Sequence, residues 1–261
     1  MRVSLIITTY NWPESLILVL RSIENQTILP KEIIIADDGS TNETKDIITK
    51  FQKKSELKII HSWQEDYGFR AAKSRNKAIA KAYGDYIILI DGDIILHRQF
   101  IQDHINNAKV GYFIQGSRVL LTQDITEQII ISKIISFSFF SKGLNSKKNS
   151  IHSNFLSKIF STYKNSTRGT RCCNIGFFKQ DCINVNGFNN EFEGWGREDS
   201  EFVVRLLNNG LNRKVVRFNA VQYHLWHKNS DRKNLDYNNQ LLQNSIKQKL
   251  KVCKKGINKY I

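Results

Sequence analysis

The chain has 261 residues, of which 41% are hydrophobic, and its 39 lysines and arginines against 24 aspartates and glutamates give a formal net charge of +15. A chain of this length and apolar content can bury a substantial core, which excludes disorder throughout. The positive charge fits a polyanionic partner such as nucleic acid, an anionic membrane surface or a phosphorylated substrate, and it equally fits a composition that is rich in lysine everywhere.

Strand-like and helix-like segments alternate over the first 120 residues. Strands are expected at 3–8, 32–36, 57–62 and 86–90, and helices are expected to begin after Pro13, near Thr44 and at Ala71. This alternation predicts an α/β fold with a parallel sheet and crossover helices. The segment Thr8–Pro13 lacks the glycine-rich patterns of dinucleotide-binding and P-loop proteins, which disfavours ordinary dehydrogenases and P-loop NTPases.

Two carboxylates follow the strand at 86–90, where Asp91 and Asp93 flank a glycine. Because ligands in open α/β sheets gather beyond the carboxyl ends of strands, these side chains are expected where the chemistry takes place. Hard oxygen ligands suit Mg²⁺ or Mn²⁺, and such an ion could hold the diphosphate of a nucleotide. The alternative is a solvated Asp-Gly turn that closes the strand.

A second acidic pair, Asp37 and Asp38, follows the strand at 32–36 and should reach the same sheet edge. Carboxylates there can accept hydrogen bonds from a ribose or a base, although either aspartate alone could instead form a turn before the next helix. Further along, Arg70 and Arg75 enter near the N-terminus of a helix. They could contact phosphate there, or they could be ordinary surface charges.

The character of the chain changes at residues 123–170, where apolar runs alternate with lysines, serines and asparagines. We expect an insertion, partly helix and partly loop, that contacts anionic lipid or forms a mobile lid over an acceptor. An ordinary helical excursion with a solvated lysine face is the alternative. Strand and helix patterning returns in residues 170–217, and the basic tail at 229–261 is expected to be helical from Asp236.

Three further features lie in the second half of the chain. Trp195 stands between two glycines, which suggests a tight loop that presents the indole to a sugar face. Glu198 and Asp199 begin a helix, where acidic residues can serve the chemistry or simply cap the helix. His224 and His227 follow an apolar segment, and either could complete a metal site, although lone histidines are mostly structural.

Neither a signal peptide nor a membrane span is expected from the sequence. Its first residues form only a strand-length apolar run, and the stretch 125–140 falls short of the roughly 20 apolar residues that a membrane span needs. The four cysteines have neither CxxC nor disulfide-framework spacing, so we expect reduced thiols and a cytoplasmic protein. Aromatic residues are not interleaved with basic ones on a strand, so no nucleic-acid partner is expected.

Taken in order, these motifs resemble the GT-A glycosyltransferases of family 2. The matching segments are Thr8–Asn11, Asp37–Ser40, Gly68–Ala72 with Arg75 and Asn76, Asp91–Asp93, Gly194–Asp199 and His227. More narrowly, the chain is similar to members with a galactosyltransferase-like C-terminal region, among them bacterial lipopolysaccharide enzymes and chondroitin polymerase domains. The resemblance spans about residues 3–228.

The resemblance implies a GT-A fold, with a mixed and mostly parallel sheet flanked by helices, a helical and loop insertion, and a basic C-terminal helix. It implies one domain at 1–228, made of a nucleotide-sugar-binding half at 1–122, the insertion at 123–170 and an acceptor-binding and catalytic half at 171–228.

The resemblance also implies roles for single residues. The nucleotide-sugar-binding set would be Thr8, Tyr10, Asp37, Asp38, Phe69, Arg70, Arg75, Asp91 and Trp195. Asp91, Asp93 and His227 would hold the metal, with His224 as the second choice for the histidine ligand. Asp199 matches the general base, and Glu198 its neighbour that contacts the acceptor. Some relatives place a further acid where Ser200 stands, so the donor or acceptor sugar could differ.

The implied activity is inverting transfer of a hexose from a UDP-linked sugar to a glycan or glycolipid acceptor, in lipopolysaccharide or capsule synthesis, with Mn²⁺ or Mg²⁺ as cofactor. The enzyme would work in the cytoplasm, peripheral on the inner face of the cytoplasmic membrane. The alternative is a catalytically silent glycan- or nucleotide-binding relative of the same fold. The clustered carboxylates Asp91, Asp93 and Asp199 argue against that alternative.

Overall fold

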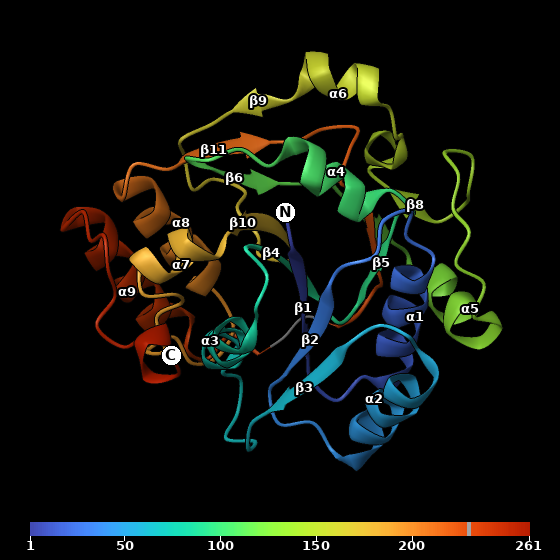
Figure 1. The fold of residues 1–261 in the computed structure, drawn as a ribbon, viewed down its shortest axis with the longest axis horizontal. Coiled ribbons are helices and arrows are strands. Elements are labelled where there is room, and N and C mark those ends of the chain that lie inside the picture. The colour runs from blue at the N-terminus through green and yellow to red at the C-terminus, as the bar shows by residue number, and fades with distance from the viewer. Residues whose placement is uncertain (229–230) are drawn as a thin grey trace.

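The computed structural model describes residues 1–228 and 231–261. The first two residues of the expected tail, 229–230, and with them the expected boundary after residue 228, lie outside the described residues. The strands form two sheets. The larger has the order β3-β2-β1-β4-β10-β6-β11-β9, and the smaller has the order β5-β12-β7-β8. Helices cover the larger sheet on both faces (Figure 1).

The N-terminal half is the predicted parallel α/β unit. In chain order it contains β1 (Val3–Thr9), α1 (Pro13–Glu24), β2 (Glu32–Asp37), α2 (Asn42–Lys54), β3 (Ile59–Trp63), α3 (Ala71–Lys81) and β4 (Tyr86–Asp91). Its four strands pair in parallel, as predicted. Leu5 and Ile33 pack toward α1 on one face, and Ile6 and Leu89 pack toward α3 on the other. Strands buried on both faces need continuous apolar runs, which explains the sequence pattern.

The sheet reverses direction beside β4. There β10 (Asn174–Phe178) pairs antiparallel with β4, so that Asn174 lies opposite Ile90. The sheet continues through β6 (Tyr112–Gln115), β11 (Asn212–Val215) and β9 (Thr162–Tyr163). Helices α4 (Phe100–Asn107), α7 (Lys179–Asn184) and α8 (Glu198–Asn208) belong to this half. The reversal brings the residues just before β10 to the edge at which β1 and β4 end.

The smaller sheet joins distant parts of the chain. It consists of β5 (Ile94–Leu96), β12 (Gln222–His224), β7 (Arg118–Leu121) and β8 (Leu144–Asn145). In the antiparallel pair of β5 and β12, His224 lies opposite Ile94. The backbone N–H of Leu225 also donates to the carbonyl of Asp93 at 3.0 Å. This pairing holds Asp93 beside the histidines that follow β12.

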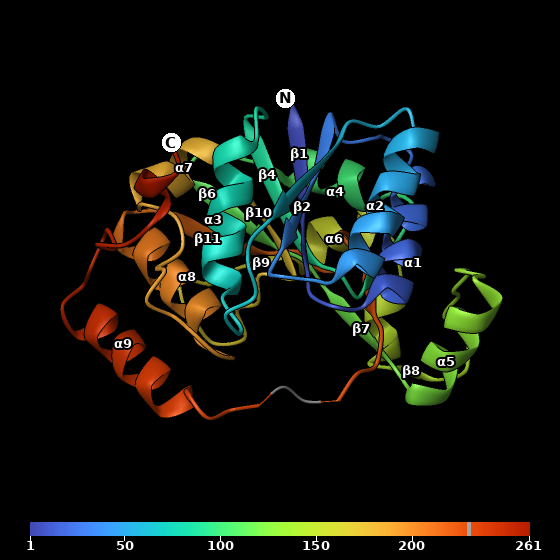
Figure 2. The same ribbon diagram turned by 90° about the horizontal axis from the view of Figure 1, so that it is seen from below.

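Helix α5 of the insertion and helix α9 of the tail lie at opposite sides of the molecule (Figure 2). The insertion contains α5 (Gln123–Ser132), β8, the short 3-10 helix η1 (Lys147–Ser150), α6 (Asn154–Phe160) and β9, so the expected mixture of helix and loop is found. In the tail, α9 (Leu235–Lys247) begins one residue before the predicted Asp236 and packs on α8, and η2 (Ile257–Lys259) follows. None of the helices in the described ranges combines the length and the apolar character needed to cross a bilayer.

Candidate active site

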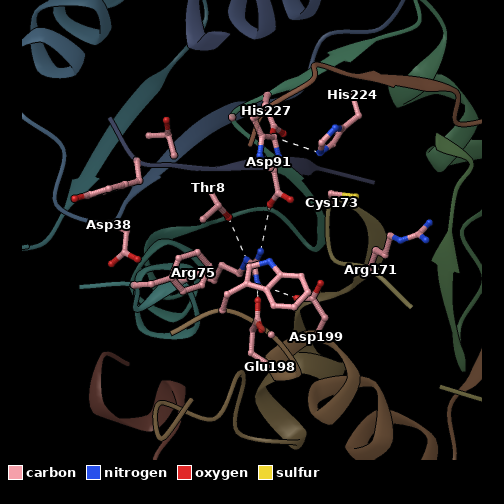
Figure 3. A pocket seen from close by; sticks show the side chains of 18 of the residues that line it. Thr8, Asp38, Arg75, Asp91, Arg171, Cys173, Glu198, Asp199, His224 and His227 are labelled. Atoms are coloured by element: carbon pink, nitrogen blue, oxygen red, sulfur yellow. Dashed lines mark hydrogen bonds and ion pairs between the residues drawn. The ribbon is translucent and has the colours of Figure 1, made fainter. Parts of the chain in front are cut away.

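A cleft of about 910 Å³ lies at the edge where β1 and β4 end (Figure 3). Its lining comes from the loop after β1, from the segments at 91–93 and 170–173, from β7, from the loop that leads into α8 and from the end of β12. Most of the residues singled out in the sequence line it. They are Thr8, Tyr10, Asp38, Phe69, Arg75, Asp91, Asp93, Trp195, Glu198, Asp199, His224 and His227.

Arg75 lies at the centre of a charged cluster. It projects from α3 and is buried, and its Nη1 contacts Asp199 Oδ1 at 2.9 Å and Glu198 Oε1 at 3.3 Å. Its Nη2 contacts Asp91 Oδ1 at 3.2 Å, and its Nε donates to Thr8 Oγ1 at 3.1 Å. Burial alone would lower the pKa of Arg75, but the surrounding carboxylates raise it well above its usual value. In this arrangement Arg75 is an internal counter-ion that joins α3, β4 and α8.

Asp199 is held from two directions. Its Oδ1 faces Arg75, and its Oδ2 accepts the backbone N–H of Cys172 at 2.7 Å, just before β10. Asp199 lies in the first turn of α8, and the preceding Arg197 has a left-handed φ of 78°. The two bonds fix the carboxylate where it lines the cleft. A carboxylate so positioned can accept a proton from a bound hydroxyl.

Glu198 and Asp91 have raised pKa values. Burial and the neighbouring Asp199 raise the pKa of Glu198 to about 7, while Arg75 acts in the opposite direction. Burial raises the pKa of Asp91 to about 6, with Arg75 opposing the shift and Asp93 and Asp199 adding to it. Several acids in one site therefore compete for the charge of a single guanidinium.

Aromatic side chains border the cleft. Trp195 is 38% exposed, and the Arg232 guanidinium lies 5.0 Å from the centre of its ring. Gly194 has a φ of 74° and Gly196 a φ of 105°, so the loop follows a path that other residues rarely adopt. Tyr10 and Phe69 are also exposed, and the Tyr10 hydroxyl donates to Asp66 Oδ2 at 2.9 Å. These flat apolar faces are suitable for stacking against a base or a sugar.

The second acidic pair divides into two environments. Asp38 lines the cleft, where its oxygens accept Gln64 Nε2 at 2.6 Å and the backbone N–H of Arg70 at 2.7 Å. Burial raises the pKa of Asp38, although these bonds oppose the shift. Asp37 is fully buried outside the lining; it accepts the backbone N–H of Ser40 at 2.8 Å and contacts His61 Nε2 at 2.8 Å. The turn-forming interpretation therefore describes Asp37, and Asp38 alone faces the cleft.

The Arg70 side chain also lies outside the lining of the cleft. Its guanidinium contacts the carbonyl of Glu65 and lies 5.0 Å from the centre of the Tyr67 ring. Only its backbone N–H reaches the site, through the bond to Asp38. In this structure Arg70 therefore positions the loop after β3.

Asp93, His224 and His227 form a group that could hold a metal ion, with ligand atoms within 4.8 Å of one another. Asp93 Oδ2 lies 3.4 Å from His224 Nε2 and 3.3 Å from His227 Nε2. The hydrogen bond to Asp93 raises the pKa of His227 to about 9, and burial lowers that of His224. Asp93 Oδ1 is buried and has no hydrogen-bond partner among the described residues. A carboxylate oxygen without a partner beside two imidazoles fits a divalent cation.

The two histidines thus occur together, although the sequence pointed to His227 with His224 as the second choice. Asp91, the other expected ligand, belongs instead to the Arg75 cluster.

Several lining residues were not found from the sequence. Arg118, Arg171, Arg197, Arg232 and Cys173 all line the cleft. Arg197 lies within the matching segment Gly194–Asp199, which gave it no role, and no motif marks the other four. Arg118 arrives through the pairing of β7 with β12, and Arg171 through the pairing of β10 with β4. Cys172 next to Arg171 contributes only its backbone N–H to Asp199, which no residue pattern can indicate.

Two family models together match residues 4–228, which contain most of the residues that line the cleft. The model "Glycosyl transferase family 2" matches residues 4–170, and the model "N-terminal domain of galactosyltransferase" matches residues 155–228. The first match alone covers more than half of the chain. The second covers the region that contains Trp195, Asp199 and His227.

The chain is also similar to curated bacterial enzymes. It is 25% identical over 229 residues to a chondroitin synthase of Pasteurella multocida (strain Pm70), an alignment of 82% of this chain and 24% of that protein. It is 36% identical over 108 residues to a cholesterol galactosyltransferase of Borreliella burgdorferi, which covers 41% of this chain and 29% of that protein. The chain thus spans about a quarter of the chondroitin synthase.

Among solved structures, S. aureus TarS 1–349 in complex with UDP matches with a TM-score of 0.62 and 18% identity, covering 93% of this chain and 64% of that chain. The complex of the same protein with UDP-GlcNAc matches with a TM-score of 0.57 and 19% identity, covering 88% of this chain and 60% of that chain. These likenesses show the fold. Together with the family match, they establish that the chain belongs to glycosyltransferase family 2 and is a transferase of GT-A fold.

Proposed function

We propose that this chain is an inverting, metal-dependent glycosyltransferase. It transfers a hexose from a UDP-linked sugar to a hydroxyl of a glycan or glycolipid acceptor in bacterial polysaccharide synthesis, of lipopolysaccharide or capsule. The observation that carries the proposal is a fixed carboxylate, Asp199, in the same cleft as the Asp93, His224 and His227 group. The solved relatives with UDP and UDP-GlcNAc support the choice of donor.

In this reaction Asp199 is the general base. It takes the proton of the acceptor hydroxyl while that oxygen attacks the anomeric carbon of the donor, and the bond from this carbon to the diphosphate breaks. One displacement inverts the anomeric configuration, so no covalent enzyme intermediate is needed. Arg75 and the N–H of Cys172 hold the carboxylate in place. A divalent cation, Mn²⁺ or Mg²⁺, held by Asp93, His224 and His227 would stabilise the negative charge of the departing diphosphate.

The donor would lie along the N-terminal side of the cleft. Asp38 would accept a hydrogen bond from the uridine, with Tyr10 and Phe69 beside the base. Trp195 would face a sugar ring. In Figure 3, Asp38 and Asp199 lie on different sides of Arg75. The diphosphate and the donor sugar would lie in the cleft between the uridine end near Asp38 and the base Asp199.

The first experiment is calorimetric binding of UDP, several UDP-hexoses and GDP-mannose, with and without Mn²⁺. We expect saturable, metal-dependent binding of the UDP species that is lost in Asp93→Ala. UDP-hexoses that bind are then tested for transfer to glycan acceptors. Absence of binding for every nucleotide would overturn the donor assignment, whereas binding without any turnover would favour the silent relative.

The exposed apolar side chains of the insertion support a location at the membrane surface. Ile131 is 81% exposed and Phe140 is 87% exposed, with Lys133 and Lys142 close in the sequence. Apolar side chains bordered by lysines fit the surface of an anionic bilayer, which would place the enzyme at the inner face of the cytoplasmic membrane. Sedimentation with vesicles of phosphatidylglycerol should deplete the protein from solution more than vesicles of phosphatidylcholine. Equal depletion by both would remove the proposal.

A further inference from the structure

Among the described residues, four arginines of the cleft form no ion pair with an acid: Arg118, Arg171, Arg197 and Arg232. Arg197 bonds to Asn239 and Arg232 lies over the Trp195 ring, which leaves Arg118 and Arg171.

Arg118, on β7, and Arg171, just before β10, both line the cleft. In the described part of the chain, the acids Asp91, Glu198 and Asp199 of the cleft all form their ion pairs with Arg75. Among the described residues, the Arg118 side chain makes a single hydrogen-bond contact, from Nη1 to Cys173 Sγ at 4.0 Å. Two guanidinium groups thus line the same cleft, and neither forms an ion pair with a described carboxylate.

The thiol beside Arg118 does not neutralise it. Burial raises the pKa of Cys173 to about 12, so the sulfur is uncharged at neutral pH. The Arg118 Nε is buried and has no hydrogen-bond partner among the described residues. Partial burial of its guanidinium and the charge of Arg118 lower the pKa of Arg171, while Cys173 and Asp199 oppose the shift. A buried donor of this kind calls for an acceptor.

The position of the pair favours the acceptor side of the cleft. Arg171 is adjacent in the chain to Cys172, whose N–H holds Asp199. Figure 3 shows Arg171 beyond Asp199 and on the other side of Arg75 from Asp38. An anion bound there would be carried by the molecule whose hydroxyl meets Asp199, whereas the uridine end of the donor is expected near Asp38.

We infer that Arg118 and Arg171 form a subsite for an oxyanion on the acceptor sugar, a phosphate or a carboxylate. This inference rests on the proposed function, because it assigns the substrate class of the same site. Guanidinium groups bind both kinds of oxyanion through paired hydrogen bonds. The subsite would select charged acceptors over neutral ones and would orient the attacking hydroxyl toward Asp199.

The test uses galactose, galactose 6-phosphate and galacturonate as probes of equal ring structure. Each is titrated by NMR into the full chain, with saturating UDP and Mn²⁺ and also without them. At least one anionic sugar should bind at least tenfold tighter than galactose, and the better of the two identifies the oxyanion. The preference should persist when UDP is bound, because the subsite lies outside the donor site.

Arg171→Gln and Arg118→Gln should each reduce the preference at least fivefold and leave UDP binding in place. Arg171 is exposed, so its variant remains informative if Arg118→Gln does not fold. Arg168→Gln is the matched control, since it removes the same charge from an exposed residue outside the cleft lining and should keep the preference.

Three results would overturn the subsite: equal binding of all three sugars, a preference that survives both variants, or anion binding that disappears when UDP is present. The last result would assign the arginines to the donor diphosphate. Failure of UDP to bind at all would count against the proposed donor alone, because the titrations without nucleotide still report on the arginines.

Discussion

The arginines that line the cleft differ in whether they form ion pairs within the fold. Arg75 is buried against three carboxylates, Asp91, Glu198 and Asp199. Arg118 and Arg171 line the same cleft and form no ion pair in the described chain, and Arg118 contacts only an uncharged thiol there. A guanidinium that is ion-paired with carboxylates of the fold stabilises the site, whereas one without such a partner is available to bind an anionic ligand. Residues of the same type thus have different roles, since Arg75 positions the carboxylates and Arg118 and Arg171 are free to bind a ligand.

The largest expected effect concerns the base that Arg75 positions. Asp199→Asn keeps the shape of the side chain and can still accept hydrogen bonds, but it cannot take the proton of the acceptor. Turnover should fall by about 10³-fold or more, while UDP binding is retained. Transfer is measured by release of UDP in the presence of acceptor. Turnover within tenfold of the unchanged chain would remove Asp199 from the role of base.

Removal of Arg75 tests whether its ion pairs stabilise the fold. Arg75→Gln leaves three acids at the centre of the cleft without their counter-ion, and the loss of one partner from a buried ionic cluster costs about 3–5 kcal/mol. The free energy of unfolding, from urea denaturation at pH 7, should fall by that amount. At pH 5 the loss should shrink, because Glu198 and Asp91, whose pKa values are raised to about 7 and about 6, are then mostly protonated. A variant as stable as the unchanged chain would show that solvent screens the cluster.

The raised pKa of Glu198 should make the free energy of unfolding depend on pH. Its pKa is raised to about 7 by burial and by Asp199, against 4.5 in the unfolded chain, so protons bind more tightly to the folded form. The resulting stabilisation is complete below pH 4.5 and is lost as the pH rises through 7. Between pH 5 and pH 8 the unchanged chain should lose roughly 1–3 kcal/mol relative to Glu198→Gln. Parallel stability curves for the two proteins would contradict this assignment.

The smallest effect is expected on the unpaired side of the cleft. Arg171→Gln removes no ion pair and relieves repulsion from Arg118, so the free energy of unfolding should change by less than about 0.5 kcal/mol. Thermal and urea denaturation check this at the same pH as for Arg75→Gln. A loss comparable to that of Arg75→Gln would mean that Arg171 has a structural partner, and the contrast between the two sides would fail.

Local patterns were enough to predict the N-terminal half. The apolar runs that became β1, β2 and β4 are buried on both faces, and Pro13 begins α1 as expected. Motif order also indicated the family, which the family models confirm. These features depend on residues near one another in sequence, or on a pattern shared with many relatives.

The rest of the site depends on contacts between distant segments. Asp93 meets His224 only because β5 pairs with β12, and Arg118 reaches the cleft through β7. Asp37 and Asp38 are adjacent and identical in type, yet the strand end turns one inward and the other toward the cleft. Periodicity cannot assign such neighbours, because a backbone turn of one residue decides which side chain is exposed.

The tail has a consequence for engineering this enzyme. Asn239 on α9 accepts a hydrogen bond from Arg197 Nε at 2.6 Å, and Asn238 donates to the carbonyl of Glu193 at 3.1 Å. Helix α9 is therefore hydrogen-bonded to the loop that contains Trp195. Ser245 also donates to Glu201 on α8 at 3.0 Å. Swapping residues 231–261 between relatives would therefore transplant part of the rim of the cleft, and chimaeras joined before α9 should differ in sugar preference as well as in surface charge.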